Sequence, residues 1–203
     1  MSAAGSSRLR RVIDLLRQDP EVPGLEEHVR RGIPVLVSNT RPDISTEAAL
    51  ARLDEALRLI EAYTPERFAV VAAEFSAILV RRYPCRAAYY PNLGVCLIEL
   101  TFLVHRDITA AQVAASIVHE SVHAASRAEG VQPDSLPAAA AEERRCRQAE
   151  IDFGLKVPGG EAVVERARAA LQLADPDVAP VIDWQLAAER VAEADRRGSD
   201  GSP

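Results

Sequence analysis

The sequence predicts a mostly helical α+β protein, and two features of its hydrophobic pattern indicate this class. Most long segments carry apolar residues at helical spacing, whereas the alternation typical of β-strands is strong only over residues 86–104. The 203 residues, of which 48% are hydrophobic, suffice to bury one sizeable core. We therefore expect a central domain over residues 25–157. A tail and short helix should precede it over residues 1–24, and helices with a disordered tail should follow over residues 158–203.

The N-terminal part is predicted to contain one short helix and one short strand. Residues 1–7 are small and polar, and we expect them to be disordered. Residues 9–18 have an amphipathic pattern that predicts a helix. Residues 33–37 are apolar enough for a strand, and Pro34 favours an edge position because proline cannot donate to a β-ladder.

Two helices are predicted to follow. Residues 46–63 carry a stripe of leucines and an isoleucine at helical spacing, opposite glutamates and arginines. Thr64 and Pro65 then favour the start of a second helix, since proline suits the first helical position. Its apolar pattern continues to about residue 82, so we expect a helical hairpin whose apolar faces meet.

The β pattern consists of residues 86–90 and 95–104, which flank a hairpin-like turn at residues 91–94. Every second residue from Cys96 to Val104 is apolar, which predicts that this face packs on helices. The opposite face carries both apolar and polar residues, and we expect that it can line a cleft.

A proline-free, alanine-rich run between Thr109 and Gly130 predicts the next helix. Thr109 and Gln112 have the spacing of a capping box, and Gly130 suits the left-handed residue beyond the helix end. The centre of this run is the sequence His119-Glu120-Ser-Val-His123. The helix therefore carries two histidines four residues apart.

Residues four apart lie on the same helical face, so both imidazoles can give a ring nitrogen to one zinc ion. Glu120 points about 100° round the helix from His119, where it can reach a metal-bound water and act as general base. This H-E-x-x-H spacing is typical of zinc metallopeptidases. The alternative is an amphipathic helix whose histidines lie on its solvent edge.

A catalytic zinc needs a third protein ligand and an open position for water. After a turn-rich segment, residues 138–153 predict a second helix, which should return antiparallel to the first. A helix rises about 1.5 Å per residue, so the residues of the second helix that lie beside the two histidines of the first are about 143–146. Glu142 and Glu143 fit that height better than Glu150, although each of the three could instead belong to a solvated face beside arginines.

On these residues the chain resembles the gluzincins, the thermolysin-like zinc peptidases, whose third ligand is a glutamate on the following helix. Glu143 stands 20 residues after His123, within that spacing. The resemblance implies a zincin-like domain with a strand before the metal helix, whose edge can hold an extended substrate. It also implies that the zinc ligands are His119, His123 and Glu143, with Glu120 as the base.

The pattern departs from thermolysin-like enzymes at two positions. Glu142 stands where those enzymes carry asparagine, and Arg147 stands where they carry aspartate. The likeness covers about 35 of the 203 residues, so it indicates a type of site and not membership of a subfamily.

Supporting roles are predicted for a few further residues. Tyr89, Tyr90 and Arg127 are candidates for the donor that stabilises an oxyanion, and the sequence does not rank them. Glu150 or Asp152 could orient a histidine through its outer ring nitrogen.

These observations predict a zinc-dependent hydrolase, a metallopeptidase with Zn²⁺ as cofactor and a peptide or protein as substrate. The alternative is a non-catalytic zincin-like module that binds proteins or uses zinc structurally. The net charge of −6 argues against nucleic acid as a partner, and no 18-residue apolar run exists to span a membrane. Three cysteines without Cys-x-x-Cys spacing, and no signal-peptide core, lead us to expect a cytoplasmic protein.

Overall fold

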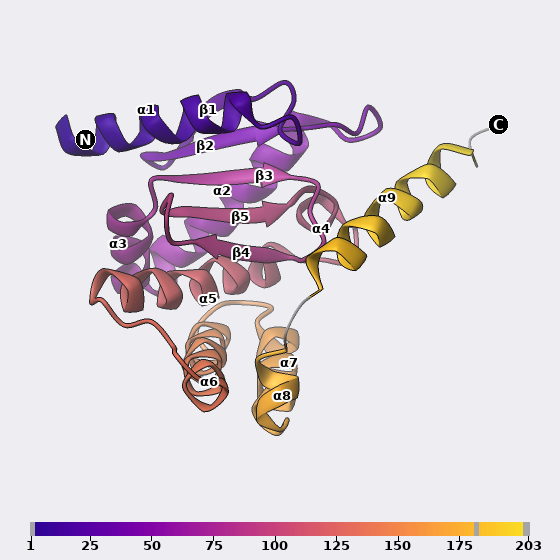
Figure 1. Cartoon of the computed structure of the whole chain (residues 1–203). Helices are drawn as coiled ribbons and strands as arrows, with labels where there is room; N and C mark the ends of the chain where they lie inside the picture. Colours follow the sequence, from indigo (N-terminus) through magenta and orange to yellow (C-terminus); the bar gives the residue numbers. More distant parts are fainter. Residues whose placement is uncertain (1–2, 181–182, 201–203) are drawn as a thin grey trace.

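A five-stranded mixed β-sheet lies at the centre of the computed structural model, which describes residues 3–180 and 183–200 (Figure 1). The strands follow the order β1-β2-β3-β5-β4, in which β2, β3 and β5 are parallel and the two outer strands are antiparallel to their neighbours. Their bounds are β1 (Glu26–Arg30), β2 (Ile33–Ser38), β3 (Ala77–Arg81), β4 (Ala87–Tyr90) and β5 (Val95–Glu99). With more than half of the chain in helices, the predicted α+β, mostly helical class is confirmed.

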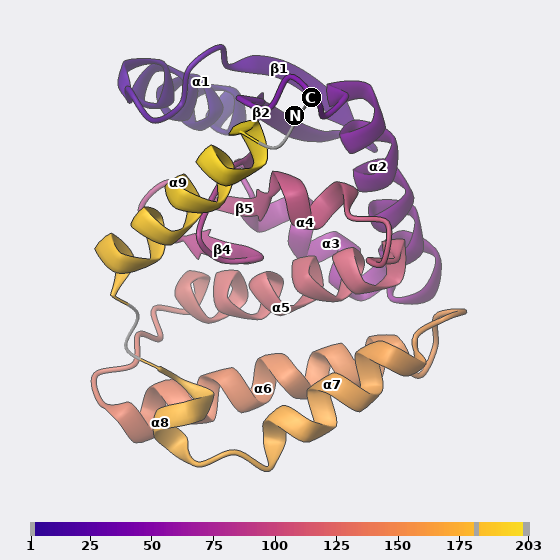
Figure 2. The same ribbon diagram turned by 90° about the vertical axis from the view of Figure 1, so that its right-hand side faces the viewer.

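Helices cover both faces of the sheet, and two more form a further layer (Figures 1 and 2). One face packs on α1 (Ala3–Gln18), and the other packs on α2 (Thr46–Tyr63), α3 (Pro65–Glu74) and α5 (Ala110–Ala128). Beyond α5 lie α6 (Leu136–Gly154) and α7 (Glu161–Leu171). The remaining helices are α4 (Leu100–Val104), α8 (Asp175–Val178) and α9 (Trp184–Asp200). None of the helices in the described part of the chain combines the length and the apolar character that crossing a membrane requires.

The main hydrophobic core fills the space between the sheet and α2, α3 and α5. The predicted stripe of α2 is confirmed, because Leu53, Leu57 and Ile60 are fully buried there. Phe153 of α6 extends the same core to the outer layer. The α5 helix, which carries both histidines of the motif, is therefore held between the sheet and α6.

The α5 helix begins and ends as the sequence predicts. The Thr109 side chain accepts a hydrogen bond from the backbone of Gln112, and the Gln112 side chain accepts one from the backbone of Thr109. Gly130 follows the helix with a φ of 76°. Since side chains satisfy two of the helix's free N–H groups, the start of α5 is fixed independently of tertiary packing.

The sheet is larger than predicted, because the region expected to be one long helix over residues 64–82 contains a strand. The α3 helix ends at Glu74, and residues 77–81 form β3 in the middle of the sheet. A parallel strand buried on both faces has a continuous apolar run, which periodicity does not distinguish from a helix. The first strand, β1, was not expected from the sequence at all.

Three predictions about the strands are also wrong. The β2 strand is not at an edge but lies between β1 and β3; Pro34 is tolerated because the β3 ladder begins only at Val35. Residues 100–104 are helical, since the Glu99 side chain accepts a hydrogen bond of 2.6 Å from the Phe102 backbone and caps α4. The mixed face of β5 does not line a cleft, because its residue Leu97 packs in the smaller core under α1.

The chain ends are more helical than predicted. Residues 3–7 belong to α1 and residues 198–200 to α9, although both segments were expected to be disordered. The remaining residues of the two predicted tails, 1–2 and 201–203, lie outside the described residues.

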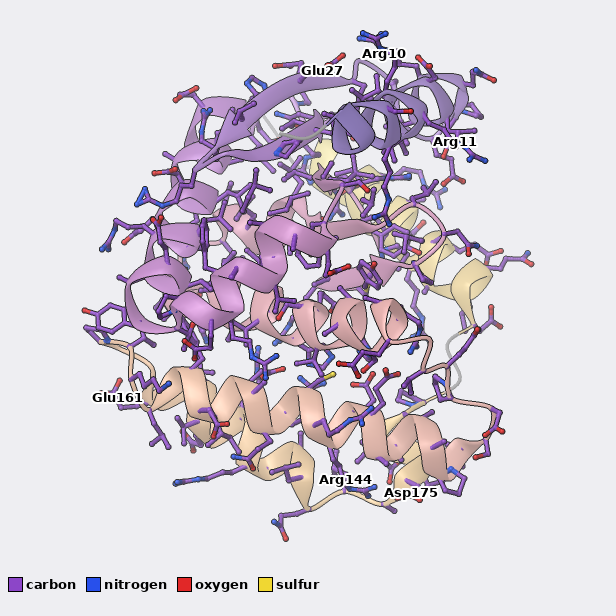
Figure 3. All side chains as sticks on the ribbon, turned by 90° about the vertical axis from the view of Figure 1, so that its left-hand side faces the viewer. Arg10, Arg11, Glu27, Arg144, Glu161 and Asp175 are labelled. Carbon is purple, nitrogen blue, oxygen red and sulfur yellow. The ribbon has the colours of Figure 1, made fainter. Side chains whose placement is uncertain are left out.

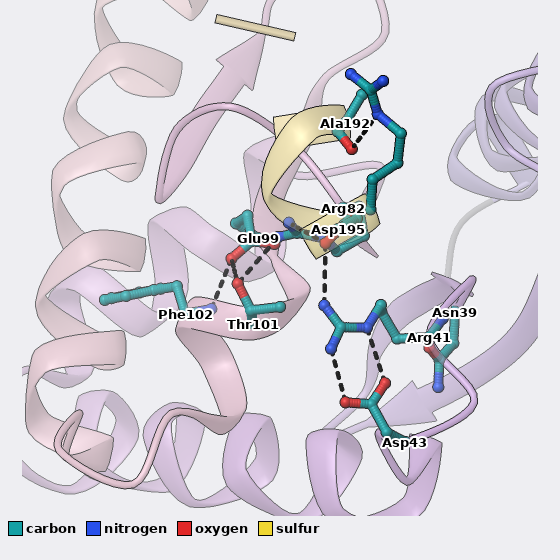
Figure 4. A network of polar contacts seen from close by, with 10 residues as sticks. Asn39, Arg41, Asp43, Arg82, Glu99, Thr101, Phe102, Ala192 and Asp195 are labelled. Atoms are coloured by element: carbon teal, nitrogen blue, oxygen red, sulfur yellow. Dashed lines mark hydrogen bonds and ion pairs between the residues drawn. The ribbon is translucent and has the colours of Figure 1, made fainter. Parts of the chain in front are cut away.

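Ion pairs fix the two C-terminal helical segments to the body of the protein. Arg144 of α6 pairs with Asp175 at the start of α8, at 2.7 Å (Figure 3). Asp195 of α9 pairs with Arg41 at 3.0 Å and with Arg82 at 2.8 Å (Figure 4). Arg82 also pairs with Glu99, so α9 is tied to the residue that caps α4.

Candidate metal centre

The candidate site lies between α5 and α6, on the side of α5 that faces away from the sheet (Figure 3). The Nε2 atom of His119 is 3.3 Å from one carboxylate oxygen of Glu143, and the Nε2 atom of His123 is 3.2 Å from the other. Glu143 stands on α6, which runs back along α5 as the sequence predicts. Glu143 thus bridges the two imidazoles, with one carboxylate oxygen on each.

Two further carboxylates contact the other ring nitrogen, Nδ1, of each histidine. Glu150 lies 2.7 Å from Nδ1 of His119, and Glu142 lies 3.4 Å from Nδ1 of His123. When a carboxylate accepts the proton of Nδ1, the neutral imidazole presents Nε2 as a ligand atom. Both histidines are therefore oriented with Nε2 toward Glu143.

Arginines neutralise these two outer carboxylates. Arg127 binds both oxygens of Glu142, at 2.9 and 3.0 Å. Glu150 is almost fully buried and receives Arg147 at 2.6 Å and Arg166 at 3.0 Å. Such second partners fix ligand orientation and are typical of metal sites.

Cys146 is a further donor, which the sequence analysis did not identify as a ligand. Its Sγ atom lies 3.5 Å from Nε2 of His123, and the side chain is fully buried. The ligand atoms of His119, His123 and Cys146 lie within 4.8 Å of one another, so this group could bind a metal ion. The spacing Glu143-x-x-Cys146, one helical turn, is the signal that could have revealed it.

Glu120 differs from the other carboxylates of the site. It is buried at 6% exposure, yet no side chain in the described ranges forms a hydrogen bond or an ion pair with it. Burial raises the pKa of its carboxyl above the ordinary value, against the attraction of the two histidines. Glu120 is thus a buried acid that is free to accept or donate a proton.

Protonation of the metal-free cluster follows from the same contacts. Burial opposes the charged form of His123, but hydrogen bonds with Cys146 and Glu143 outweigh it and raise its pKa to about 10. Burial likewise opposes ionisation of Glu143, but the two histidines lower the pKa of its carboxyl well below the ordinary range. Without metal, positive imidazoles and negative carboxylates hold the cluster together, and a metal ion would replace the imidazole protons.

A cavity of about 730 Å³ opens onto this cluster. Its walls are β4, α5, α6 and α7, together with residues 178–180. His119, Glu120 and His123 line it, and so does Glu143, whereas Cys146 does not. The β4 strand is the last strand of the sheet, so one of its backbone edges is unpaired beside the cavity.

The candidate oxyanion donors lie in different places. The side chain of Tyr90 packs in the smaller core on the opposite face of the sheet, so the structure does not bring it to the site. Tyr89 lines the cavity, but its ring stacks on Phe75 with centroids 5.8 Å apart. Arg127 also lines the cavity, where both of its terminal nitrogens are engaged by Glu142. Asp152 is exposed and pairs with Gln148, so Glu150 alone of the two predicted candidates contacts a histidine.

Comparisons with known protein families, with curated proteins and with solved structures found no match.

Proposed function

We propose that the protein is a zinc-dependent hydrolase of peptide bonds, in which His119, His123 and Glu143 bind the metal and Glu120 is the general base. The observation that carries the proposal is the buried Glu120 carboxylate, which is unpaired among the described residues and shares a cavity with two imidazoles and the Glu143 carboxylate. An acid with no structural partner beside three potential ligands is the combination that metal-assisted hydrolysis requires.

The donor distances support zinc. For a tetrahedral ion bound at about 2.0–2.1 Å, two nitrogen or oxygen ligands are about 3.3 Å apart. Nε2 of His119 is 3.3 Å from one oxygen of Glu143, and Nε2 of His123 is 3.2 Å from the other, so a carboxylate that binds through both oxygens fits these spacings. Two histidines and one carboxylate are also a ligand set found in catalytic zinc sites, whose fourth position stays open. Because Glu143 and both histidines line the cavity, that position would face it.

When bound, zinc would lower the pKa of a water molecule and polarise the substrate carbonyl. Glu120 would take the proton of the attacking water and pass it to the leaving amine. Its raised pKa suits this exchange, because a base that is too acidic holds the transferred proton weakly. Glu142 and Glu150 would keep the imidazoles neutral and aligned throughout.

The free edge of β4 supports a peptide as the substrate. Three of its residues, Ala87, Ala88 and Tyr89, line the cavity beside the metal cluster. An extended peptide can pair with an unpaired strand edge through backbone hydrogen bonds, which recognise the main chain rather than particular side chains. A zincin-like arrangement is part of this proposal, but the free edge is not on the strand that the sequence led us to expect: β5, the last strand before α5, is paired on both sides, so the peptide would pair with β4.

The test compares zinc-loaded wild type with Glu120→Gln on a defined peptide mixture, followed by mass spectrometry. Wild type should produce new peptide ends, and Glu120→Gln should keep about one zinc per chain while its turnover falls at least about a hundredfold. Glu129→Gln is the matched control, since Glu129 is exposed at the end of the same helix. Equal turnover by Glu120→Gln and wild type, or no turnover by either, would refute the proposal.

One observation favours a second candidate function, a structural zinc module. A zinc-bound sulfur at about 2.3 Å lies about 3.5–3.6 Å from a neighbouring nitrogen ligand, and Cys146 lies 3.5 Å from His123 Nε2. If Cys146 bound together with Glu143, four protein ligands would close the site. Cys146→Ser should then release zinc and unfold the protein, whereas in the catalytic proposal this variant keeps both metal and activity.

A further inference from the structure

One end of the cavity, beyond Glu150, is lined by three arginines from three separate parts of the chain. Arg86 directly precedes β4, Arg147 stands on α6 and Arg166 on α7. In the described part of the chain, Glu150 is the only carboxylate paired with any of them, and it is already shared by two arginines and His119. Within a chain of net charge −6, this end of the cavity has a local surplus of positive charge.

Hydrogen-bond donors remain unused in this arginine cluster. The Nε atom of Arg166 is buried and has no hydrogen-bond partner. The guanidinium of Arg86 lies over the ring of Phe102 at 5.6 Å, and the Arg86 side chain forms no ion pair or hydrogen bond with the described residues. Partial desolvation, together with the charges of Arg166 and Arg147, lowers the pKa of Arg86, although the residue as a whole is exposed to solvent. The buried Nε donor of Arg166 and the crowded like charges of the three arginines would both be relieved when an anion binds.

The direction of β4 relates this cluster to the orientation of a bound peptide. β4 begins beside Arg86 and ends at Tyr90, and the next residue, Pro91, lines the cavity. Antiparallel pairing is somewhat more stable per residue than parallel pairing. A peptide paired antiparallel to β4 would therefore run toward Arg86, with its C-terminus at the arginine cluster.

The cluster is close to the reacting centre. Glu150 contacts His119 on one side and Arg166 on the other, at 2.7 and 3.0 Å. A metal on the far nitrogen of His119 would thus lie no more than about 12 Å from the Arg166 guanidinium. An extended chain advances about 3.4 Å per residue, so at most about three residues fit between the two.

We propose that the arginine cluster binds the C-terminal carboxylate of the substrate, so that the protein removes a short segment of one to about three residues from peptide C-termini. Guanidinium groups bind carboxylates through two parallel hydrogen bonds, which the free donors of Arg86 and Arg166 can supply. Hydrolysis breaks the C–N bond of the peptide, adds the water's hydroxyl to the acyl carbon and transfers its proton through Glu120 to the amine. This inference rests on the proposed function.

The test measures binding rather than turnover, so that it is separate from the test of the proposed function. Zinc-loaded Glu120→Gln protein is titrated with three fluorescent, N-acetylated peptides of one length. The first has a free C-terminal carboxylate, the second is its C-terminal amide, and the third is the amide with one internal glutamate. The free acid should bind about tenfold to a hundredfold more tightly than either amide, the range expected for a charge-assisted bidentate contact.

Substitution of the cluster completes the test. Adding Arg86→Gln should reduce the preference for the free acid at least about tenfold. Arg168→Gln, on the exposed side of the helix that carries Arg166, should leave the preference unchanged. Equal binding of acid and amide, or no binding of either, would overturn the proposal. Equal binding of the free acid and the internal glutamate peptide would overturn the C-terminal assignment.

Discussion

The proposed ligand set predicts an order of zinc affinities among three glutamate variants. Glu143→Ala removes a metal ligand, whereas Glu150→Gln and Glu142→Gln change groups that only orient the histidines. Structural zinc sites with four ligands bind with about 10–16 kcal/mol, so one ligand is worth about 3 kcal/mol. Glu143→Ala should therefore weaken zinc binding about a hundredfold or more.

The two outer carboxylates should have smaller effects that follow their distances from the histidines. Glu150 is 2.7 Å from His119 Nδ1, and Glu150→Gln should weaken zinc binding about tenfold or somewhat more. Glu142 is 3.4 Å from His123 Nδ1, which is a weaker contact, so Glu142→Gln should weaken zinc binding less than about tenfold. Gln keeps the shape of the side chain in both cases, so the comparison isolates the charge.

Competition against a chromophoric zinc chelator, at fixed pH and with folding checked by circular dichroism, measures all three affinities. The reasoning is refuted if Glu143→Ala binds zinc within about threefold of wild type, a change well under 1 kcal/mol. Loss of zinc from Glu142→Gln alone would show that the wrong face of α6 has been assigned to the metal.

Three further predictions concern stability. Arg127→Met leaves the carboxylate of Glu142, which is 3% exposed, without its bidentate partner. It should lower the free energy of unfolding, measured by urea titration, by about 2–4 kcal/mol. Combining Arg127→Met with Glu142→Gln should restore part of the lost stability. Phe153→Ala removes a fully buried ring and should cost about 3–5 kcal/mol by the same measurement. In the metal-free protein, the pKa of His123 is higher in the folded state than in the unfolded state, so protonation of His123 stabilises the fold. This stabilisation is complete below about pH 6.5 and is lost as the pH rises through about 10. The melting temperature should therefore fall across this range.

The features that the sequence predicted correctly depend on geometry within one or two helices. The orientation of His119 and His123 and the capping box of α5 follow from helical periodicity alone. The position of Glu143 opposite the histidines required only the assumption of an antiparallel helical hairpin. The 100° step between neighbouring residues likewise explains why Glu143 contacts Nε2 of His123 whereas Glu142 contacts Nδ1.

The features that were missed depend on tertiary contacts. Residues 77–81 form a buried parallel strand, whose apolar run has the same appearance as a helix until its partners β2 and β5 are known. The arginine cluster joins residues 86, 147 and 166, which are far apart in the chain and belong to no motif. Tyr90 was a reasonable candidate by type, but the pleat of β4 directs it to the opposite face.

The X-ray absorption spectrum of the zinc-loaded protein tests the central claim most directly, because it gives the identity and distance of the metal's ligands. The catalytic proposal predicts nitrogen and oxygen ligands at about 2.0–2.1 Å and no sulfur at about 2.3 Å, because in that proposal Glu143 is the third ligand and the fourth position is left to water. A sulfur ligand that disappears in Cys146→Ser would contradict it and would identify a closed, structural zinc site.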